Sequence, residues 1–180
     1  MCIAILAKPG LRLTEAQIAT CWRKNSDGGG FAYVTDDGKL TVVKELKKVS
    51  RFIKLYEKHL PLATNSPMLI HFRIRTHGQI SIANTQPIVI SNRCAYIHNG
   101  VISRMPMDKV HSDTVLFKNT VLRRLNDGFH NHKEVLEMIQ MVIGGSKMVF
   151  LHEDRTHGII GERQGDWIDG IWYSNSSHKD

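Results

Sequence analysis

The order of strand-like and helix-like segments constrains the fold of this chain most strongly. Alternating or short apolar runs predict strands, and a 3.6-residue apolar period predicts helices. The expected strands are residues 2–7, 31–34, 40–43, 67–74, 88–91, 94–98, 147–152, 157–161 and 168–173. The expected helices are residues 14–24, 50–60, 112–125 and a following segment with Val135, Met138, Ile139 and Val142. Because these segments are grouped in blocks without strict alternation, we expect an α+β fold with antiparallel sheets.

Local signals place some of the boundaries. Thr14, with Gln17 three residues later, predicts a capping box at the start of the first helix. Ser50 is the expected cap of the second helix. The turn at residues 36–38, Asp-Asp-Gly between two strand patterns, predicts a hairpin.

Length and composition favour one domain. A chain of 180 residues with 42% hydrophobic content can bury a substantial core. We expect one domain over residues 1–180, with a short loose tail at 176–180. No apolar run approaches the roughly 18–20 residues that span a bilayer, and the start does not resemble a secretion signal, so we expect no membrane partner.

The cysteines favour a cytoplasmic protein. Cys2, Cys21 and Cys94 are odd in number, widely spaced and without a Cys-x-x-Cys pair. This spacing argues against a disulfide framework and against a structural zinc site. Reduced thiols in the cytoplasm are the expectation.

The formal net charge of +7 could attract polyanions. Part of the excess lies in the basic run at residues 44–54. No recognised nucleic-acid motif accompanies this run, so a solvated helix face explains it more simply than a nucleic-acid partner.

Cys2 follows Met1 directly, so removal of one residue would give Cys2 both a thiol and a free α-amine. Such an amine, with a pKa of about 7.7–8.0, can take the proton of its own thiol. The alternative is that Cys2 is a small hydrophobic residue that opens the first strand. Its position alone does not choose between them.

The segment His71–Gly78 combines a strand pattern with clustered charge. Alternation places His71, Arg73 and Arg75 on one strand face and the apolar residues between them on the other. Two arginines on one face suit an anion, because a guanidinium binds a carboxylate in bidentate fashion. An ordinary charged, solvent-facing strand is the alternative.

The pair Asn99-Gly100 follows an apolar strand. Locally it is a signal for a type I′ hairpin turn. The functional alternative is that the Asn99 side-chain amide and the Gly100 backbone N–H donate to a developing oxyanion.

Ser112-Asp113-Thr114 opens the helix pattern of the second half. Ser and Asp at a helix start are typical of capping. If Asp113 instead faces a cleft, its carboxylate could bind an ammonium group.

Together these pieces resemble the class II glutamine amidotransferases, the glutaminase domains of the N-terminal nucleophile (Ntn) hydrolases. The likeness covers nearly the whole chain. Cys2 falls at the family's processed nucleophile, and three segments match the family's His-x-Arg-x-x-Thr-x-Gly, His-Asn-Gly and Ser-Asp-Thr motifs: His71–Gly78, His98–Gly100 and Ser112–Thr114. Residues 25–30 and 172–176 add weaker likeness.

The resemblance implies a four-layer αββα sandwich of two antiparallel sheets flanked by helices. It also implies that Cys2 attacks the side-chain amide of glutamine while Asn99 and Gly100 hold the oxyanion. The intermediate would be a γ-glutamyl thioester, and the products glutamate and ammonia. No cofactor is expected.

The resemblance further implies how glutamine is bound. Arg73, helped by Thr76 and His77, would bind the α-carboxylate, and Asp113 would bind the α-ammonium. Arg75 stands where many relatives carry a small or apolar residue, so it either points to solvent or favours a more acidic substrate.

A metal site is the alternative for the histidines. Its best cluster would be His71, His77, His98 and His111, but no pair has zinc-type spacing on one helix turn with an acidic companion. We therefore expect no metal ligands.

The chain ends where a glutaminase domain of this family ends, so we expect a separate ammonia-accepting synthase as partner. The first hypothesis is a stand-alone glutamine-hydrolysing amidotransferase domain. The alternative is a non-catalytic glutamine-binding or regulatory protein with the same fold. The sequence does not give the oligomeric state.

Overall fold

The computed structural model describes residues 2–106 and 108–179, which form two antiparallel sheets. The first sheet has the strand order β3-β2-β4-β1-β10-β9. Its strands are β1 (Ile3–Ala7), β2 (Gly29–Val34), β3 (Leu40–Glu45), β4 (Met68–Phe72), β9 (Asp166–Ile168) and β10 (Ile171–Tyr173). The second sheet, in the order β5-β6-β7-β8, contains β5 (Ile88–Ser91), β6 (Cys94–Asn99), β7 (Lys147–His152) and β8 (His157–Ile160).

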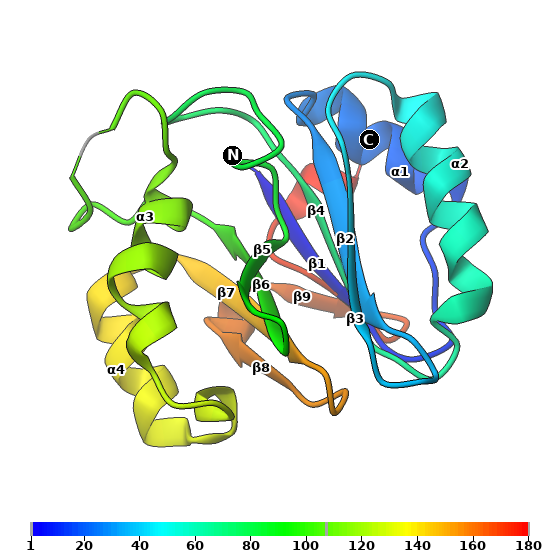
Figure 1. The fold of residues 1–180 in the computed structure, drawn as a ribbon. Helices are drawn as coiled ribbons and strands as arrows, with labels where there is room; N and C mark the ends of the chain where they lie inside the picture. The colour runs from blue at the N-terminus through cyan, green and yellow to red at the C-terminus, as the bar shows by residue number, and fades with distance from the viewer. Residues whose placement is uncertain (1, 107, 180) are drawn as a thin grey trace.

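Helices cover the outer face of each sheet. Helices α1 (Glu15–Lys24) and α2 (Val49–His59) lie on the first sheet, and α3 (Asp113–Thr120) and α4 (Lys133–Ile143) lie on the second (Figure 1). Short 3₁₀ turns complete the chain: η1 (Leu60–Leu62), η2 (Leu122–Arg124), η3 (Phe129–Asn131), η4 (Glu162–Gln164) and η5 (Ser176–His178). The predicted α+β sandwich of four layers is confirmed.

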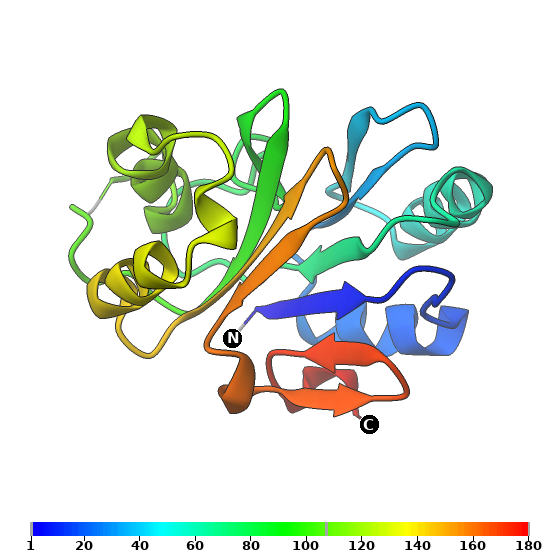
Figure 2. The ribbon, with the colours of Figure 1, turned by 90° about the horizontal axis from the view of Figure 1, so that it is seen from below.

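Strand β1 lies in the middle of the first sheet, between β4 and β10 (Figure 2). Ile3 and Ile5 pack under α1 and α2, and Ala4 and Leu6 face the second sheet. Because both faces are buried, the strand is a continuous apolar run. Full burial of one large aliphatic side chain contributes about 1.5–3 kcal/mol, so this strand is a rigid base for Cys2.

The capping box of α1 is confirmed. Thr14 accepts a hydrogen bond from Gln17 N, and the Gln17 side chain accepts one from Thr14 N. The hairpin of β2 and β3 is also confirmed, since Val34 pairs with Leu40 across the predicted turn.

The predicted cap of α2 is wrong. The helix begins at Val49, and its N-cap is Lys48, which makes no side-chain capping bond. The Glu45 carboxylate instead accepts hydrogen bonds from the backbone N–H groups of Lys47 and Lys48, immediately before the helix. Ser50 therefore lies inside the first turn.

The predicted strand 168–173 is also wrong, because the segment is a hairpin. Strands β9 and β10 pair with Ile168 opposite Ile171. Asp169 and Gly170 between them have φ values of +48° and +80°, as a type I′ turn requires. The Asp-Gly signal was present in the sequence.

Two details of the second helical block differ from expectation. Helix α3 ends at Thr120, and the chain tightens into η2, which brings Leu122 into the core with Phe117. Met138, expected on the apolar face of α4, is 66% exposed, while Ile139 is buried.

The predicted strand 67–74 ends early, at Phe72. Arg73 is buried, whereas Arg75 is exposed and lies beyond the strand. The expectation that Arg73 and Arg75 share a strand face is therefore wrong, because the chain leaves the sheet between them.

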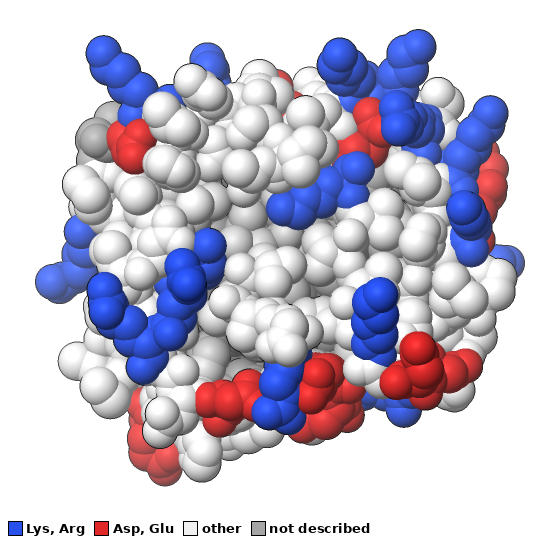
Figure 3. Space-filling model, viewed as in Figure 1, with Lys and Arg blue, Asp and Glu red and all other residues white. Residues whose placement is uncertain are grey.

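Two residues of the basic run, Lys44 and Arg51, have local partners. Lys44 Nζ donates to Ile82 O at 3.1 Å, and burial lowers the pKa of Lys44 to about 8. Arg51 pairs with Glu45 at 3.0 Å. Figure 3 shows Lys and Arg in separate groups on this face, with acidic side chains gathered along the lower edge.

The segment expected to be a loose tail contains η5, where the His178 ring stacks on Tyr173 at 3.9 Å. Asp180 and Met1 lie outside the described residues, so the expected removal of Met1 concerns a position without structural description. None of the helices in the described part of the chain is long and apolar enough to cross a membrane.

Candidate active site

Cys2 lies beside the end of β4. Because Ile3 pairs with Phe72, Cys2 is next to the chain that leaves the sheet. Its thiol donates to Ile74 O at 3.2 Å, and Ile74 N–H points at Cys2 Sγ from 3.4 Å. Cys2 remains partly exposed, so a small molecule can reach the sulfur.

The thiol of Cys2 is not activated by its surroundings alone. Burial raises the pKa of Cys2, and the Ile74 hydrogen bond and the Arg73 charge offset only part of that rise. The sulfur is therefore protonated at neutral pH, and a nucleophilic role needs a base.

Two buried histidines of the motif segments are structural. Burial lowers the pKa of His71 to about 3 and that of His98 to about 4, so both are neutral near pH 7. His71 Nε2–H donates to His98 O at 3.1 Å, and His98 Nδ1 lies 2.9 Å from Thr114 Oγ1. These contacts tie β4 to β6 and β6 to α3.

The hairpin interpretation of Asn99-Gly100 is wrong. Strand β6 pairs with β5 and β7, and the chain after Gly100 leads to α3 without returning along β6. A type I′ turn needs positive φ at both central residues, and Asn99 does not have one.

The Asn99 side chain is held by the last strand of the first sheet. Asn99 Nδ2–H donates to Ser174 Oγ at 2.8 Å, and the same oxygen accepts from Ala4 N–H at 2.9 Å. Ser174 N–H in turn donates to Ala4 O at 2.9 Å. Ser174 therefore connects the Asn99 amide with β1, the strand that follows Cys2.

Position 100 requires glycine because the backbone there lies close to Ser146. Its φ is +143°, and a Cβ at this position would lie 2.2 Å from Ser146 Oγ. Ser146 Oγ–H donates to Val101 O at 3.2 Å. The backbone around Gly100 is thus packed against the turn that precedes β7.

Arg73 holds the loop that follows β4. Its guanidinium donates to Gln79 O and to His77 O, both at 2.9 Å, and the residue is only 4% exposed. Gly78, with φ of +69°, lies against the start of α3, where a Cβ would come within 2.6 Å of Ser112 N. The loop therefore spans from Arg73 to the segment of Asp113.

Asp113 occupies the first turn of α3. Ser112 is the N-cap and accepts from Val115 N–H at 3.2 Å, so the capping interpretation holds for Ser112. Asp113 Oδ2 accepts from Ile102 N–H at 2.7 Å and Oδ1 from Thr114 N–H at 2.9 Å. This carboxylate fixes the chain two residues after Gly100.

Asp113 and His77 line one pocket of about 240 Å³. Val101, Ile102 and Ser103 form another part of its wall, so the pocket lies beside the chain that leaves Gly100. Cys2, Arg73 and Asn99 are not among its lining residues, so this pocket is not by itself the space around the sulfur.

The remaining predicted substrate residues lie on the loop after β4. Thr76 is exposed and His77 is half-buried. His77 Nδ1 has no hydrogen-bond partner among the described residues. Arg75 is exposed, and its backbone N–H donates to Asp27 Oδ2 at 2.7 Å.

Three residues near Cys2 were not singled out from the sequence. Asn175 Nδ2–H donates to Cys2 O at 2.7 Å, next to the Ser174 network. Asp27 is joined to the loop after β4 through its N–H to Arg73 O at 2.9 Å. The weak likeness of residues 25–30 and 172–176 was the available signal.

The fold and the ordered motifs are those of class II glutamine amidotransferase domains of the Ntn hydrolase type, to which the chain is similar at modest identity. Among characterised relatives, the chain is 27% identical over 150 residues to glutamine–fructose-6-phosphate aminotransferase (isomerizing) of Escherichia coli O6:H1, covering 77% of this chain and 24% of that protein. The enzyme of the same description from Tropheryma whipplei (strain Twist) is 26% identical over 149 residues, covering 76% and 24%. The chain thus spans about a quarter of the length of these relatives. No protein-family model matches it.

Solved structures show the same fold. Glutamine phosphoribosylpyrophosphate amidotransferase from B. subtilis superimposes with a TM-score of 0.60 at 16% identity, covering 96% of this chain and 41% of that one. A structure described as the allosteric regulatory enzyme of purine biosynthesis gives a TM-score of 0.58 at 16% identity, with the same coverage.

Proposed function

We propose that this protein hydrolyses the side-chain amide of glutamine through a thioester on Cys2. The observation that carries the proposal is the hydrogen-bond link from Asn99 through Ser174 to the strand of Cys2. It supports the proposal because it ties an amide donor to the strand that follows the partly exposed Cys2, and an acyl-transfer site needs a donor near its nucleophile.

The first half of the reaction forms the thioester. With Met1 removed, the Cys2 α-amine takes the thiol proton, and the sulfur attacks the side-chain amide carbon of glutamine. Asn99 Nδ2–H and Gly100 N–H donate to the oxygen of the tetrahedral intermediate. When this intermediate collapses, the C–N bond breaks and the α-ammonium gives its proton to the departing ammonia.

The second half releases glutamate. The free α-amine now takes a proton from water, and the resulting hydroxide attacks the thioester carbon. The C–S bond breaks, the sulfur regains a proton and the free thiol is restored. The raised pKa of Cys2 supports the need for this internal base, and the buried His71 and His98 are poor candidates for it.

Glutamine is recognised at both charged ends in this proposal. Arg73, with Thr76 and His77, binds the α-carboxylate, and Asp113 binds the α-ammonium. Arg73 already donates to two loop carbonyls, so the loop position decides which of its remaining N–H groups reach the substrate. Asp113 and His77 line the same pocket, which supports a shared contact of these two residues with one small molecule.

We further propose that the ammonia passes to a separate acceptor synthase. The relatives are described as a fructose-6-phosphate aminotransferase and a phosphoribosylpyrophosphate amidotransferase, and this chain matches only part of each. Copurification of the native protein is the direct search for this acceptor.

Glutamine turnover tests the proposal. Purified protein incubated with glutamine should release glutamate and ammonia in equal amounts, and Cys2→Ala should abolish this release. Cys21→Ala, which removes a buried thiol from α1, is the matched control and should retain activity. Equal release by the parent and Cys2→Ala contradicts the proposal, and glutamine binding without turnover by the parent indicates the non-catalytic alternative.

A further inference from the structure

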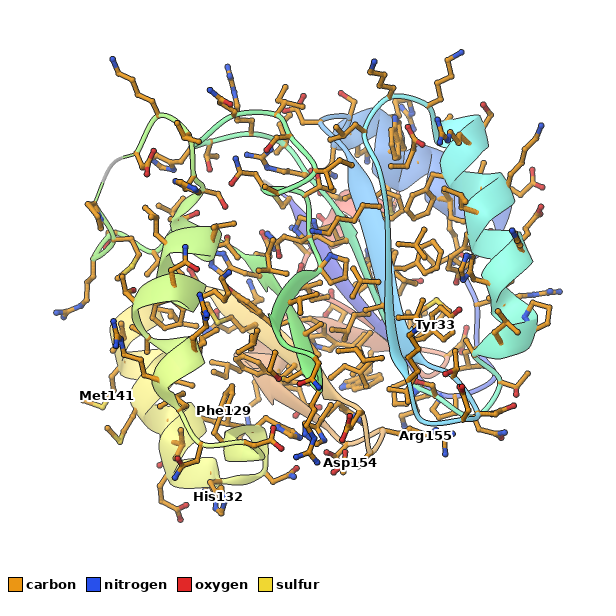
Figure 4. All side chains as sticks on the ribbon, in the orientation of Figure 1. Tyr33, Phe129, His132, Met141, Asp154 and Arg155 are labelled. Carbon is orange, nitrogen blue, oxygen red and sulfur yellow. The ribbon has the colours of Figure 1, made fainter. Side chains whose placement is uncertain are left out.

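A second cluster of ionisable groups lies far from Cys2. His152 ends β7 and pairs with Cys94, at the opposite end of β6 from Asn99. His130 comes from η3, and Asp154 from the turn between β7 and β8. Each of His130, His152 and Asp154 offers one ligand atom, and these atoms lie within 4.8 Å of one another. Figure 4 shows Asp154 at the lower edge of the molecule.

The His152 ring faces a carboxylate at each nitrogen. Its Nε2 lies 3.1 Å from Asp127 Oδ1, and its Nδ1 lies 3.1 Å from Asp154 Oδ1. A neutral imidazole carries only one N–H, so it can donate to only one of them. The Asp154 backbone N–H points at His152 Nδ1 from 3.4 Å, and the tautomer with the lone pair on Nδ1 and the proton on Nε2 satisfies this contact.

The environment of His152 Nε2 is typical of a metal-binding histidine. A ligating imidazole usually donates its other N–H to a carboxylate, which fixes the ring orientation. Here that carboxylate is Asp127, which forms an ion pair with Arg93. In this tautomer, the lone pair of His152 Nδ1 faces Asp154 Oδ1 and the two atoms repel each other. A cation bound to both atoms would remove this repulsion.

His130 supplies the second imidazole. It is 2% exposed, its ring stacks on that of His152 at 5.1 Å, and its Nδ1 has no partner among the described residues. Its Nε2 lies 2.7 Å from Thr156 Oγ1, which donates to Asp154 Oδ1 at 2.6 Å. Burial lowers the pKa of His130, so the ring is neutral and available as a ligand at pH 7.

We propose that His130, His152 and Asp154 bind a divalent first-row transition-metal ion such as Zn²⁺. Two imidazoles and one carboxylate suit these ions, whereas Mg²⁺ and Ca²⁺ prefer oxygen ligands. The Asp154 side chain is half exposed, so water can complete the coordination. The bound ion would join η3 to the β7–β8 turn, and this role is independent of glutamine hydrolysis.

Zinc binding to the metal-free full-length chain tests the proposal. The Cys2→Ala background removes the one partly exposed thiol, which could compete for zinc. Isothermal titration calorimetry with ZnCl₂ should show one bound ion per chain. Thermal unfolding with ZnCl₂ present should show a higher Tm, and MgCl₂ should give neither effect. Asp154→Asn should raise the Kd for Zn²⁺ by about tenfold or more.

The control variant is His132→Gln, which replaces an exposed histidine two residues from His130 and should leave Kd unchanged (Figure 4). Absence of zinc binding, or equal Kd in the parent and Asp154→Asn, overturns the proposal.

A spectrum of the parent protein provides a test that needs no folded variant. Co²⁺ should give visible absorption bands of a nitrogen- and oxygen-ligated ion, and ZnCl₂ should displace them. A Co²⁺ spectrum identical to that of the aqueous ion overturns the proposal.

Discussion

The side-chain amide of Asn99 donates a 2.8 Å hydrogen bond to Ser174 Oγ, which also accepts from the backbone of Ala4. One hydroxyl therefore sets the distance between the proposed oxyanion donor and the strand of the nucleophile. Ser174 makes no proposed contact with glutamine, so it is a positioning residue.

Ser174→Ala should lower kcat by about 10-fold or more with little change in KM, because the Asn99 amide loses its orientation in the transition state. Asn99→Ala should cost more, about 10²–10³-fold in kcat, since it removes the donor itself. Steady-state kinetics with glutamine check both values. An increase in KM alone for Ser174→Ala would assign Ser174 to substrate binding instead.

Gly100→Ala should abolish turnover and destabilise the fold. The new Cβ would lie 2.2 Å from Ser146 Oγ, at a φ of +143° that side chains rarely adopt. We expect a loss of about 1–3 kcal/mol in the free energy of unfolding, measured in urea. Ser146→Gly in the same chain should restore part of this stability, and a lack of any recovery would show that backbone strain, rather than the clash, dominates.

Asp113→Asn should raise KM for glutamine about 10- to 100-fold, because a charged hydrogen bond to the α-ammonium contributes about 1.5–3 kcal/mol. The substrate glutaramide, which lacks the α-ammonium and the α-carboxylate, provides the comparison. Its turnover should be equally poor in the parent and in Asp113→Asn. A KM for glutamine that is unchanged in the variant would remove Asp113 from the binding site.

Stability should fall as the pH drops below about 6.5. His71 and His98 have folded-state pKa values of about 3 and about 4, so between these values and 6.5 the unfolded chain binds protons that the folded chain does not. Each histidine contributes up to about 1.4 kcal/mol per pH unit in that range. Urea unfolding at pH 7 and pH 5 measures the loss, and a smaller pH dependence in His98→Gln than in the parent is expected.

Elements defined by local chemistry could be predicted from the sequence. The capping box of Thr14 and Gln17 lies within four residues and is present as expected. The end of β4 was not predictable, because Arg73 leaves the sheet to hold backbone carbonyls of its own loop. The alternation that suggested a longer strand contains no information about those contacts.

The candidate site was only partly predictable for the same reason. The ordered motifs pointed to Cys2, Asn99 and Asp113 as candidates, but Ser174 contacts partners 75 and 170 residues away. The cluster of His130 and His152 likewise joins separate segments without a recognisable spacing. Contacts of this kind follow from the register of the strands, which the sequence alone did not specify.

The bonds from Ser174 to Ala4 and from Asn175 to Cys2 also bear on protein synthesis. A nascent chain carries the proposed nucleophile from the start, but Ser174 and Asn175, which contact Ala4 and Cys2, are translated much later. A ribosome-bound intermediate that lacks residues 174–175 would therefore have a sulfur without an organised catalytic centre. On the proposed function, glutamine consumption would begin only after Ser174 and Asn175 had emerged and folded against the start of the chain.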